Sequence, residues 1–184
     1  MNITEKILAR ASGKSTVSPD DIVFAKVDKV MVHDVSGPGV LKVFDKLQKQ
    51  GIDTSKLHDP TKVWIAEDHF VPSAEKISAE NIVKLSNFSK KYNIKKHFKY
   101  GMGQYGICHT LSHEEALVNP GDVYVGGDSH TNTTGALGAF ACGLGHTDIA
   151  YVLLNGEIWF KVPETYYFKL NGKLPPHVMA KDFI

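Results

Sequence analysis

Acidic and imidazole side chains are neighbours at several places in the sequence, and three of these places lie close to predicted strands. These places are His33-Asp34, Asp68-His69 and the run Asp128-Ser129-His130. Imidazole exchanges protons near neutral pH, and a nearby carboxylate fixes its tautomer and raises its basicity. One Asp-His pair is weak evidence, because the 184 residues include nine histidines and chance neighbours are common. Repetition of the pairing favours a proton-transfer site.

Small residues surround the third of these groups. The stretch 126–150 reads "GGDSHTNTTGALGAFACGLGHTDIA" and has almost no bulky side chain close to Asp128. We expect the small residues that follow Asp128-Ser129-His130 to leave space for a ligand.

The elements that must position these groups can be predicted from the residue pattern. Segments 21–28, 62–67 and 123–127 are typical strands, because β-branched and aromatic residues dominate them. Asp68-His69 follow the second strand, Asp128 follows the third, and the first strand leads after a few residues to His33. A short strand is also predicted near 94–98 and a strand pair within 157–173.

Helical patterns alternate with these strands. Asn2 and Glu5 have capping-box spacing before a short first helix. Further helices are predicted at 40–50, at 74–92 with Ser73 as its cap, at 108–118, and after residue 127. Alternation of strands and helices predicts one α/β domain over residues 1–184 with a mostly parallel sheet. Ligands bind beyond the carboxyl ends of the strands in such sheets.

Composition is that of an ordinary globular protein. The net charge is +1, and no apolar run is long enough to cross a bilayer. The first residues lack the apolar core of a signal peptide, so we expect a cytoplasmic protein with neither a membrane nor a nucleic acid as partner. Cys108 and Cys142 are far apart, which favours reduced, packed thiols. Two cysteines alone cannot hold an iron–sulfur cluster of the usual kind.

Several other motifs are typical of different functions. "GMGQYG" (101–106) matches the dinucleotide fingerprint, but the segment before it is too polar for the required strand, so a glycine turn is favoured. "GDSHT" lacks the second glycine of a nucleophile elbow, and the chain has no P-loop. His109 and His113 have a zinc-binding spacing on a predicted helix, although Glu114 does not complete an H-E-x-x-H motif. We expect His113 on the surface.

A non-enzymatic alternative is an RNA-binding module. The segment from Lys90 to Lys99 interleaves basic and aromatic residues, and such a module would bind in a salt-dependent way. The near-neutral net charge favours a solvated helix end with buried aromatic side chains instead.

The sequence resembles the aconitase superfamily, and within it the large subunits of 3-isopropylmalate dehydratase and homoaconitase. The resemblance extends over the whole chain. It is carried by "TEKILARASGK", "VHDVSGP", "EDHFVPS", "GICHT", "NPGDVYVGGDSHTNTTGALGAFACGLGHTDIA", "GEIWFKVPET" and "PPHVMAKD". The ordered set is far more specific than any single motif.

The resemblance implies a three-layer α/β/α fold around a [4Fe-4S] cluster at a domain interface. Family enzymes isomerise hydroxy di- and tricarboxylates by dehydration and rehydration. The residues that match the family's catalytic positions are Asp68, His69, His109, Asp128 and His130. Ser129 and His33 match positions that contact substrate.

The resemblance also implies what this chain does not supply. Family large subunits hold the cluster with three cysteines from a later segment, so we expect no metal ligand in this chain and the cluster cysteines beyond Ile184. The chain is then an N-terminal portion of a large subunit, inactive alone and completed by a small subunit with a swivelling domain. The favoured reaction is 3-isopropylmalate isomerisation in leucine biosynthesis; homoaconitase, dimethylmalate dehydratase and aconitase are alternatives.

Overall fold

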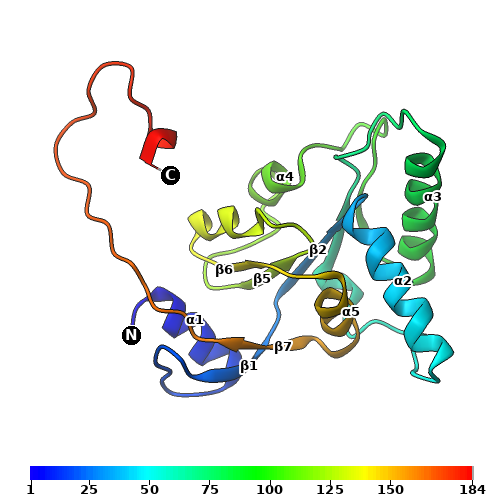
Figure 1. Ribbon diagram of the computed structural model, residues 1–184, viewed down its shortest axis with the longest axis horizontal. Helices are drawn as coiled ribbons and strands as arrows, with labels where there is room; N and C mark the ends of the chain where they lie inside the picture. Colours follow the sequence, from blue (N-terminus) through cyan, green and yellow to red (C-terminus); the bar gives the residue numbers. More distant parts are fainter. Residues whose placement is uncertain (184) are drawn as a thin grey trace.

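The structure is a computed structural model that describes residues 1–183. Its centre is a five-stranded sheet in which all neighbouring strands are parallel, in the order β4-β3-β2-β5-β6 (Figure 1). The strands are β2 (Lys29–His33), β3 (Val63–Ala66), β4 (Lys96–Phe98), β5 (Val123–Gly126) and β6 (Phe140–Gly143). The helices are α1 (Ile3–Ser12), α2 (Ser36–Lys49), α3 (Lys76–Lys91), α4 (Cys108–Glu114) and α5 (His146–Asn155), with short 3-10 helices η1 (Pro60–Lys62), η2 (Thr131–Leu137) and η3 (Ala180–Phe183).

Both faces of the parallel sheet are covered. Val30 and Val32 of β2 belong to a large core cluster that includes residues of α1, α2, α3 and α5, whereas Met31 belongs to a smaller cluster with α4. Successive side chains of a strand point to opposite faces, so strands buried on both faces are apolar throughout. The prediction of an α/β fold with a mostly parallel sheet is confirmed.

The first predicted strand, segment 21–28, is not part of the parallel sheet. Strand β1 (Ile22–Lys26) pairs antiparallel with β7 (Glu157–Lys161) in a separate two-stranded ribbon. A second strand, β2, follows after only two residues and carries His33 into the parallel sheet. The turn at Val27-Asp28 contains neither glycine nor proline, so no residue pattern marks the end of the first strand.

Four other expectations are corrected. Segment 157–173 is not a strand pair, because β7 ends at Lys161 and the chain then leads away from the sheet (Figure 1). The helical pattern after residue 127 contains η2 and the edge strand β6 before α5. Helix α2 begins at Ser36, four residues early, since a proline in the first turn needs no intrahelical hydrogen bond. Helix α3 begins at Lys76, and the Ser73 hydroxyl donates to the carbonyl of Phe70 instead of capping it.

Two further features agree with the sequence. Asn2 and Glu5 form the predicted capping box of α1, and both cysteines are free thiols. Within residues 1–183, no helix combines the length and apolar character that crossing a membrane requires. The assignment of residues 1–184 to a single domain stays a prediction.

Candidate active site

The polar groups singled out in the sequence gather at one edge of the parallel sheet. His33 ends β2, Asp68 and His69 follow β3, and Asp128 follows β5. Strand β2 lies in the middle of the sheet: β3 and β4 are added on one side of it, and β5 and β6 on the other. The strand order therefore reverses at β2. Such a switch point opens a crevice beyond the carboxyl ends of the strands, where open α/β sheets bind ligands.

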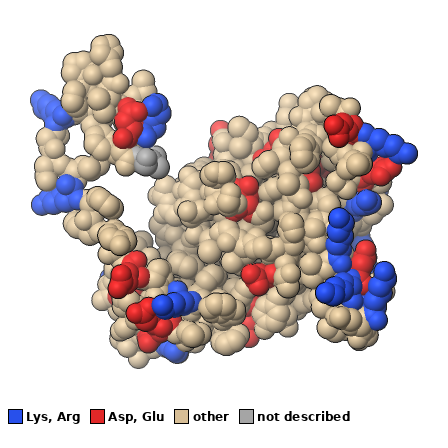
Figure 2. All heavy atoms as spheres, viewed as in Figure 1, with Lys and Arg blue, Asp and Glu red and all other residues tan. Residues whose placement is uncertain are grey.

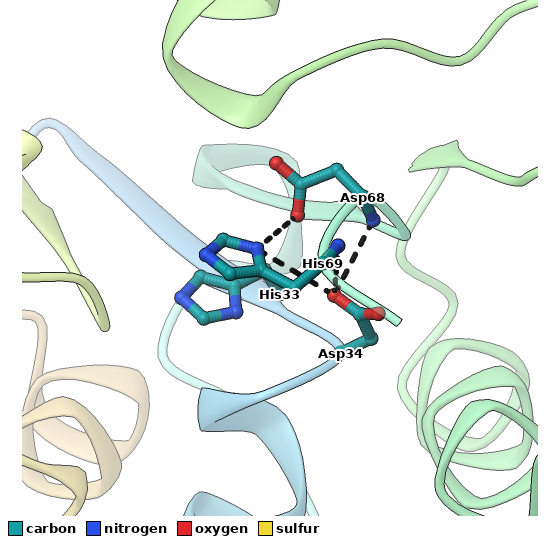
Figure 3. A group of neighbouring side chains, drawn as sticks. All are labelled: His33, Asp34, Asp68 and His69. Carbon is teal, nitrogen blue, oxygen red and sulfur yellow. Dashed lines mark hydrogen bonds and ion pairs between the residues drawn. The ribbon is translucent and has the colours of Figure 1, made fainter. Parts of the chain in front are cut away.

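Asp68 and His69 form a short pair at this edge of the sheet. His69 Nδ1 lies 2.6 Å from Asp68 Oδ1, and the His69 ring stacks on His33 with centroids 4.2 Å apart (Figure 3). The other oxygen of Asp68 accepts the N–H of Cys108, the first residue of α4, at 2.6 Å. The partial positive charge of a helix N-terminus stabilises a carboxylate in that position.

Asp68 therefore stays ionised. Burial acts to raise its pKa, but the hydrogen bonds from Cys108 and His69 outweigh burial, and the pKa of Asp68 is lowered. The ionised carboxylate holds the proton of His69 at Nδ1. Because the His69 side chain is 37% exposed, its ring can exchange a proton with a ligand through Nε2.

Asp34 holds the loop that carries this pair. Its carboxylate is 1% exposed and accepts three consecutive backbone N–H groups, from Asp68 at 3.3 Å, His69 at 3.1 Å and Phe70 at 2.6 Å. Figure 3 shows Asp34 below the Asp68–His69 pair, on the side of β2. From the sequence, Asp34 could be recognised only as a neighbour of His33. Its contacts with the loop after β3 could not be predicted, because they are made to backbone groups that lie far away in the sequence.

Asp128 is a second carboxylate that faces several imidazoles. Its Oδ1 accepts His109 Nε2–H at 2.8 Å and the backbone N–H of His130 at 2.7 Å. Its Oδ2 lies 3.6 Å from His33 Nε2 and 3.8 Å from His69 Nε2. Burial acts to raise the pKa of Asp128, but these hydrogen bonds outweigh it and the pKa is lowered. The ionised Asp128 links the β2 and β3 groups to His109 of α4.

His33 is the buried member of the site. Its Nδ1 accepts the backbone N–H groups of Val35 and Ser36 at 3.1 and 3.3 Å, so its proton is on Nε2. Burial and the neighbouring His69 lower the pKa of His33, which keeps the ring neutral. The predicted contact of His33 with substrate stays a prediction; in the structure, the ring lies against His69 and its Nε2 faces Asp128.

The rim of the site consists of Ser129 and His130. Both side chains are exposed, and the His130 ring lies 6.3 Å from that of His109 between centroids. The structure thus brings together all seven residues singled out in the sequence, on four different elements or loops. Their roles in catalysis and binding stay predictions.

The glycines beside Asp128 are required for close packing. A Cβ atom on Gly126 or Gly127 would collide with the side chains of Thr131 or Ser36, and one on Gly143 would collide with the backbone carbonyl of Asp128. The expectation that the small residues after His130 leave space for a ligand is therefore wrong at Gly143. The three glycines allow the turn after β5 to lie tightly against β2 and β6.

A buried pair next to the site was not anticipated. His97 Nε2 of β4 lies 2.9 Å from Glu67 Oε1, and both side chains are only 4% exposed. The second oxygen of Glu67 accepts the N–H of Tyr100 at 3.1 Å. Glu67 directly precedes Asp68, so the pair ties the end of β4 to the site loop. His97 lies in a lysine-rich segment that suggested a solvated surface.

The alternative sites do not assemble. His113 is exposed and its Nδ1 lies 2.7 Å from the backbone oxygen of His109, whereas His109 Nε2 faces Asp128, so the two rings do not converge on one position. In the lysine segment, Tyr92 and Phe98 are buried and cannot stack on bases. Figure 2 shows the Lys and Arg side chains of the face in view at its margins.

The donor atoms of residues 1–183 do not fit an iron–sulfur cluster. Burial and the nearby Asp68 raise the pKa of Cys108 far above its ordinary value, and burial also raises the pKa of Cys142. Cluster ligands must be thiolates, which these surroundings disfavour. The carboxylate oxygens of Asp34 and Asp68 already accept hydrogen bonds from backbone groups and from His69.

Comparison with known proteins gives a consistent picture. A family model described as "Aconitase family (aconitate hydratase)" matches residues 5–184. The 3-isopropylmalate dehydratase large subunit of Aquifex aeolicus is 48% identical over 184 residues, which is all of this chain and 41% of that protein. The large subunit of Heliobacterium modesticaldum is 46% identical and the probable large subunit of Methanothermobacter thermautotrophicus is 43% identical. The chain spans 41–42% of the length of these relatives.

Proposed function

The chain belongs to the aconitase family, and on this basis we propose that it carries the proton-transfer side chains of a hydro-lyase. The reaction is the isomerisation of a hydroxy di- or tricarboxylate by dehydration and rehydration. Similarity to 3-isopropylmalate dehydratase large subunits favours 3-isopropylmalate as the substrate, in leucine biosynthesis. The intact enzyme also contains a small subunit.

The family implies an iron–sulfur cluster in the intact enzyme. Since neither Cys108 nor Cys142 is suited to bind one, we place the cluster ligands outside residues 1–183. The role of this chain is therefore derived from its own imidazoles and carboxylates.

The short Asp68–His69 pair carries the proposal. Dehydration releases a hydroxyl group, and hydroxide is a poor leaving group unless a proton is donated to it as the bond breaks. His69 can donate this proton from Nε2 while Asp68, 2.6 Å from Nδ1, stabilises the ring in the correct orientation. In rehydration, the same nitrogen accepts a proton from water.

Asp128 organises the opposite side of the site. It orients His109 through a 2.8 Å hydrogen bond and fixes the loop of His130 through the backbone. The exposed Ser129 hydroxyl and His130 ring can donate hydrogen bonds to substrate carboxylates. Both groups lie on the same rim and would therefore contact one end of the substrate.

The test uses the intact two-subunit enzyme. His69→Gln should lower kcat for conversion of 3-isopropylmalate by about 10²–10⁴-fold, the usual contribution of a general acid. Iron and sulfide content should stay unchanged, because His69 is proposed as an acid and not as a ligand. His113→Gln replaces an exposed histidine of α4 outside the site and is the matched control. Equal turnover in the two variants would refute the assignment.

A further inference from the structure

Glu67 and Asp68 are adjacent carboxylates that hold the two ends of one connection. Residues 99–107 join β4 to α4 and consist of turns and irregular backbone. Glu67 Oε2 accepts the backbone N–H of Tyr100 at 3.1 Å, near the start of this connection. Asp68 Oδ2 accepts that of Cys108 at 2.6 Å, directly after its end. The two carboxylates therefore tie the loop after β3 to both ends of the connection.

The connection itself supplies little packing that could fix its position. Gly101 and Gly103 have φ angles of +75° and +83°, which residues with side chains rarely adopt. Met102, Tyr105 and Ile107 are 74%, 49% and 64% exposed. Segments with few buried apolar contacts open easily. The position of the connection thus depends on the hydrogen bonds at its ends.

His97 of β4 keeps the Glu67 carboxylate in place. His97 Nε2 lies 2.9 Å from Glu67 Oε1, and both side chains are 4% exposed. The contact is electrostatic, because the two atoms are not aligned as a hydrogen bond. The Glu67 N–H also donates to the carbonyl of Phe98 at 3.0 Å. A buried carboxylate is stable only with such partners, so Glu67 has one defined position.

The position of His69 depends on Asp68. The second oxygen of Asp68 lies 2.6 Å from His69 Nδ1, so a shift of the carboxylate turns the imidazole. His109 does not depend on the same contacts, since Asp128 orients it separately at 2.8 Å. A proton donor must lie within about 2.6–3.2 Å of the atom that it protonates. A misplacement of about 1 Å can lower the rate by about 10²-fold.

From these contacts we infer that Glu67 is a positioning residue for proton transfer. Together with Asp68, it fixes His69 relative to the first turn of α4. Its carboxylate is buried against His97 and the N–H of Tyr100, so it acts on the reaction through His69 and not by contact with substrate. The inference rests on the proposed function, because it requires His69 to be the proton donor.

Replacing Glu67 by glutamine in the intact two-subunit enzyme tests the inference. Glutamine keeps the size of the side chain and one acceptor oxygen, but it removes the charge that faces His97. In Glu67→Gln, kcat for 3-isopropylmalate should fall by about 10- to 100-fold, up to the loss that a misplacement of about 1 Å causes. KM should change by less than about 2-fold, because Glu67 is not placed against substrate. Glu114→Gln makes the same change at an exposed position of α4 and should leave kcat unchanged.

A second background separates positioning from a general loss of structure. Combined with His69→Gln, the Glu67→Gln change should lower kcat by less than about 2-fold further, because the side chain through which Glu67 acts is already missing. His97→Gln should show the same dependence on His69, and it provides a second variant if Glu67→Gln does not assemble. A general loss of structure would lower kcat equally in both backgrounds, and that result would overturn the inference.

The positioning role and the proposed function fail in different ways. If His69→Gln lowers kcat while Glu67→Gln and His97→Gln equal the control, only the positioning role is overturned. If His69→Gln itself keeps the turnover of the unmodified enzyme, the proposed function is overturned and the positioning role with it.

Discussion

Replacing Asp34 by asparagine would disturb the loop that carries Asp68 and His69 without changing the size of the side chain. Asp34 is 1% exposed, and its two oxygens accept three backbone N–H groups of that loop. Asparagine offers one acceptor atom in place of two, whichever way its amide is turned. The amide nitrogen then meets a backbone N–H group, and that buried donor is left without a partner.

The magnitude follows from the bonds that change. A hydrogen bond to a charged group contributes about 1.5–3 kcal/mol, and an unpaired buried donor costs about 1–3 kcal/mol. One bond is lost and the other two lose the assistance of the charge, so we expect the free energy of unfolding to fall by about 3 kcal/mol. For a domain of this size, that corresponds to a decrease in Tm of roughly 6–12 °C.

Urea and thermal denaturation, followed by the fluorescence of the buried Trp64, would measure this change. Asp45→Asn is the matched control, because Asp45 is exposed on α2 and its replacement should alter the free energy of unfolding by less than about 0.5 kcal/mol. If Asp34→Asn is no less stable than this control, the loop is held by other contacts and the reasoning is wrong.

Three further predictions concern the same site. Gly143→Ala should lower the free energy of unfolding by about 1–3 kcal/mol in urea titrations, because its Cβ meets the carbonyl of Asp128. Gly145→Ala has open space and should not. Burial lowers the pKa of His33 below 6.5, so the unfolded chain takes up a proton at a higher pH than the folded chain, and the free energy of unfolding decreases as the pH is lowered. His33→Gln should therefore reduce the decrease in the free energy of unfolding between about pH 7 and pH 5. A pH dependence identical to that of the unmodified protein would contradict this. Asp128→Asn should lower kcat of the intact enzyme by about 10²-fold through loss of His109 orientation; near-normal turnover in steady-state assays would show that this pairing is unimportant.

Much of the sheet could be predicted because its central strands are distinctive. Strands β3 and β5 are buried on both faces, which makes them continuous apolar runs with clear ends. Strand β6 could not be predicted, because its glycine and alanine residues have no strand preference and its conformation depends on pairing with β5. Sequence patterns record local preference, whereas edge strands are defined by their neighbours.

The site shows the same division. Asp68, His69 and Asp128 were found because they follow recognisable strands, and the ends of parallel strands meet at one edge. The roles of Asp34 and Glu67 were missed, because they act on backbone groups and on a histidine from other parts of the chain. Burial of a carboxylate has no signature in a single sequence.

The stack of His33 on His69 connects two strands that are joined by a long crossover, and Asp128 reaches it from a third strand much later in the chain. Parallel strands with such distant partners pair slowly, because the entropy of closing long loops is lost before the contacts form. The two imidazoles come face to face only once β2 and β3 have paired. Their ring-current shifts would therefore report this pairing during folding.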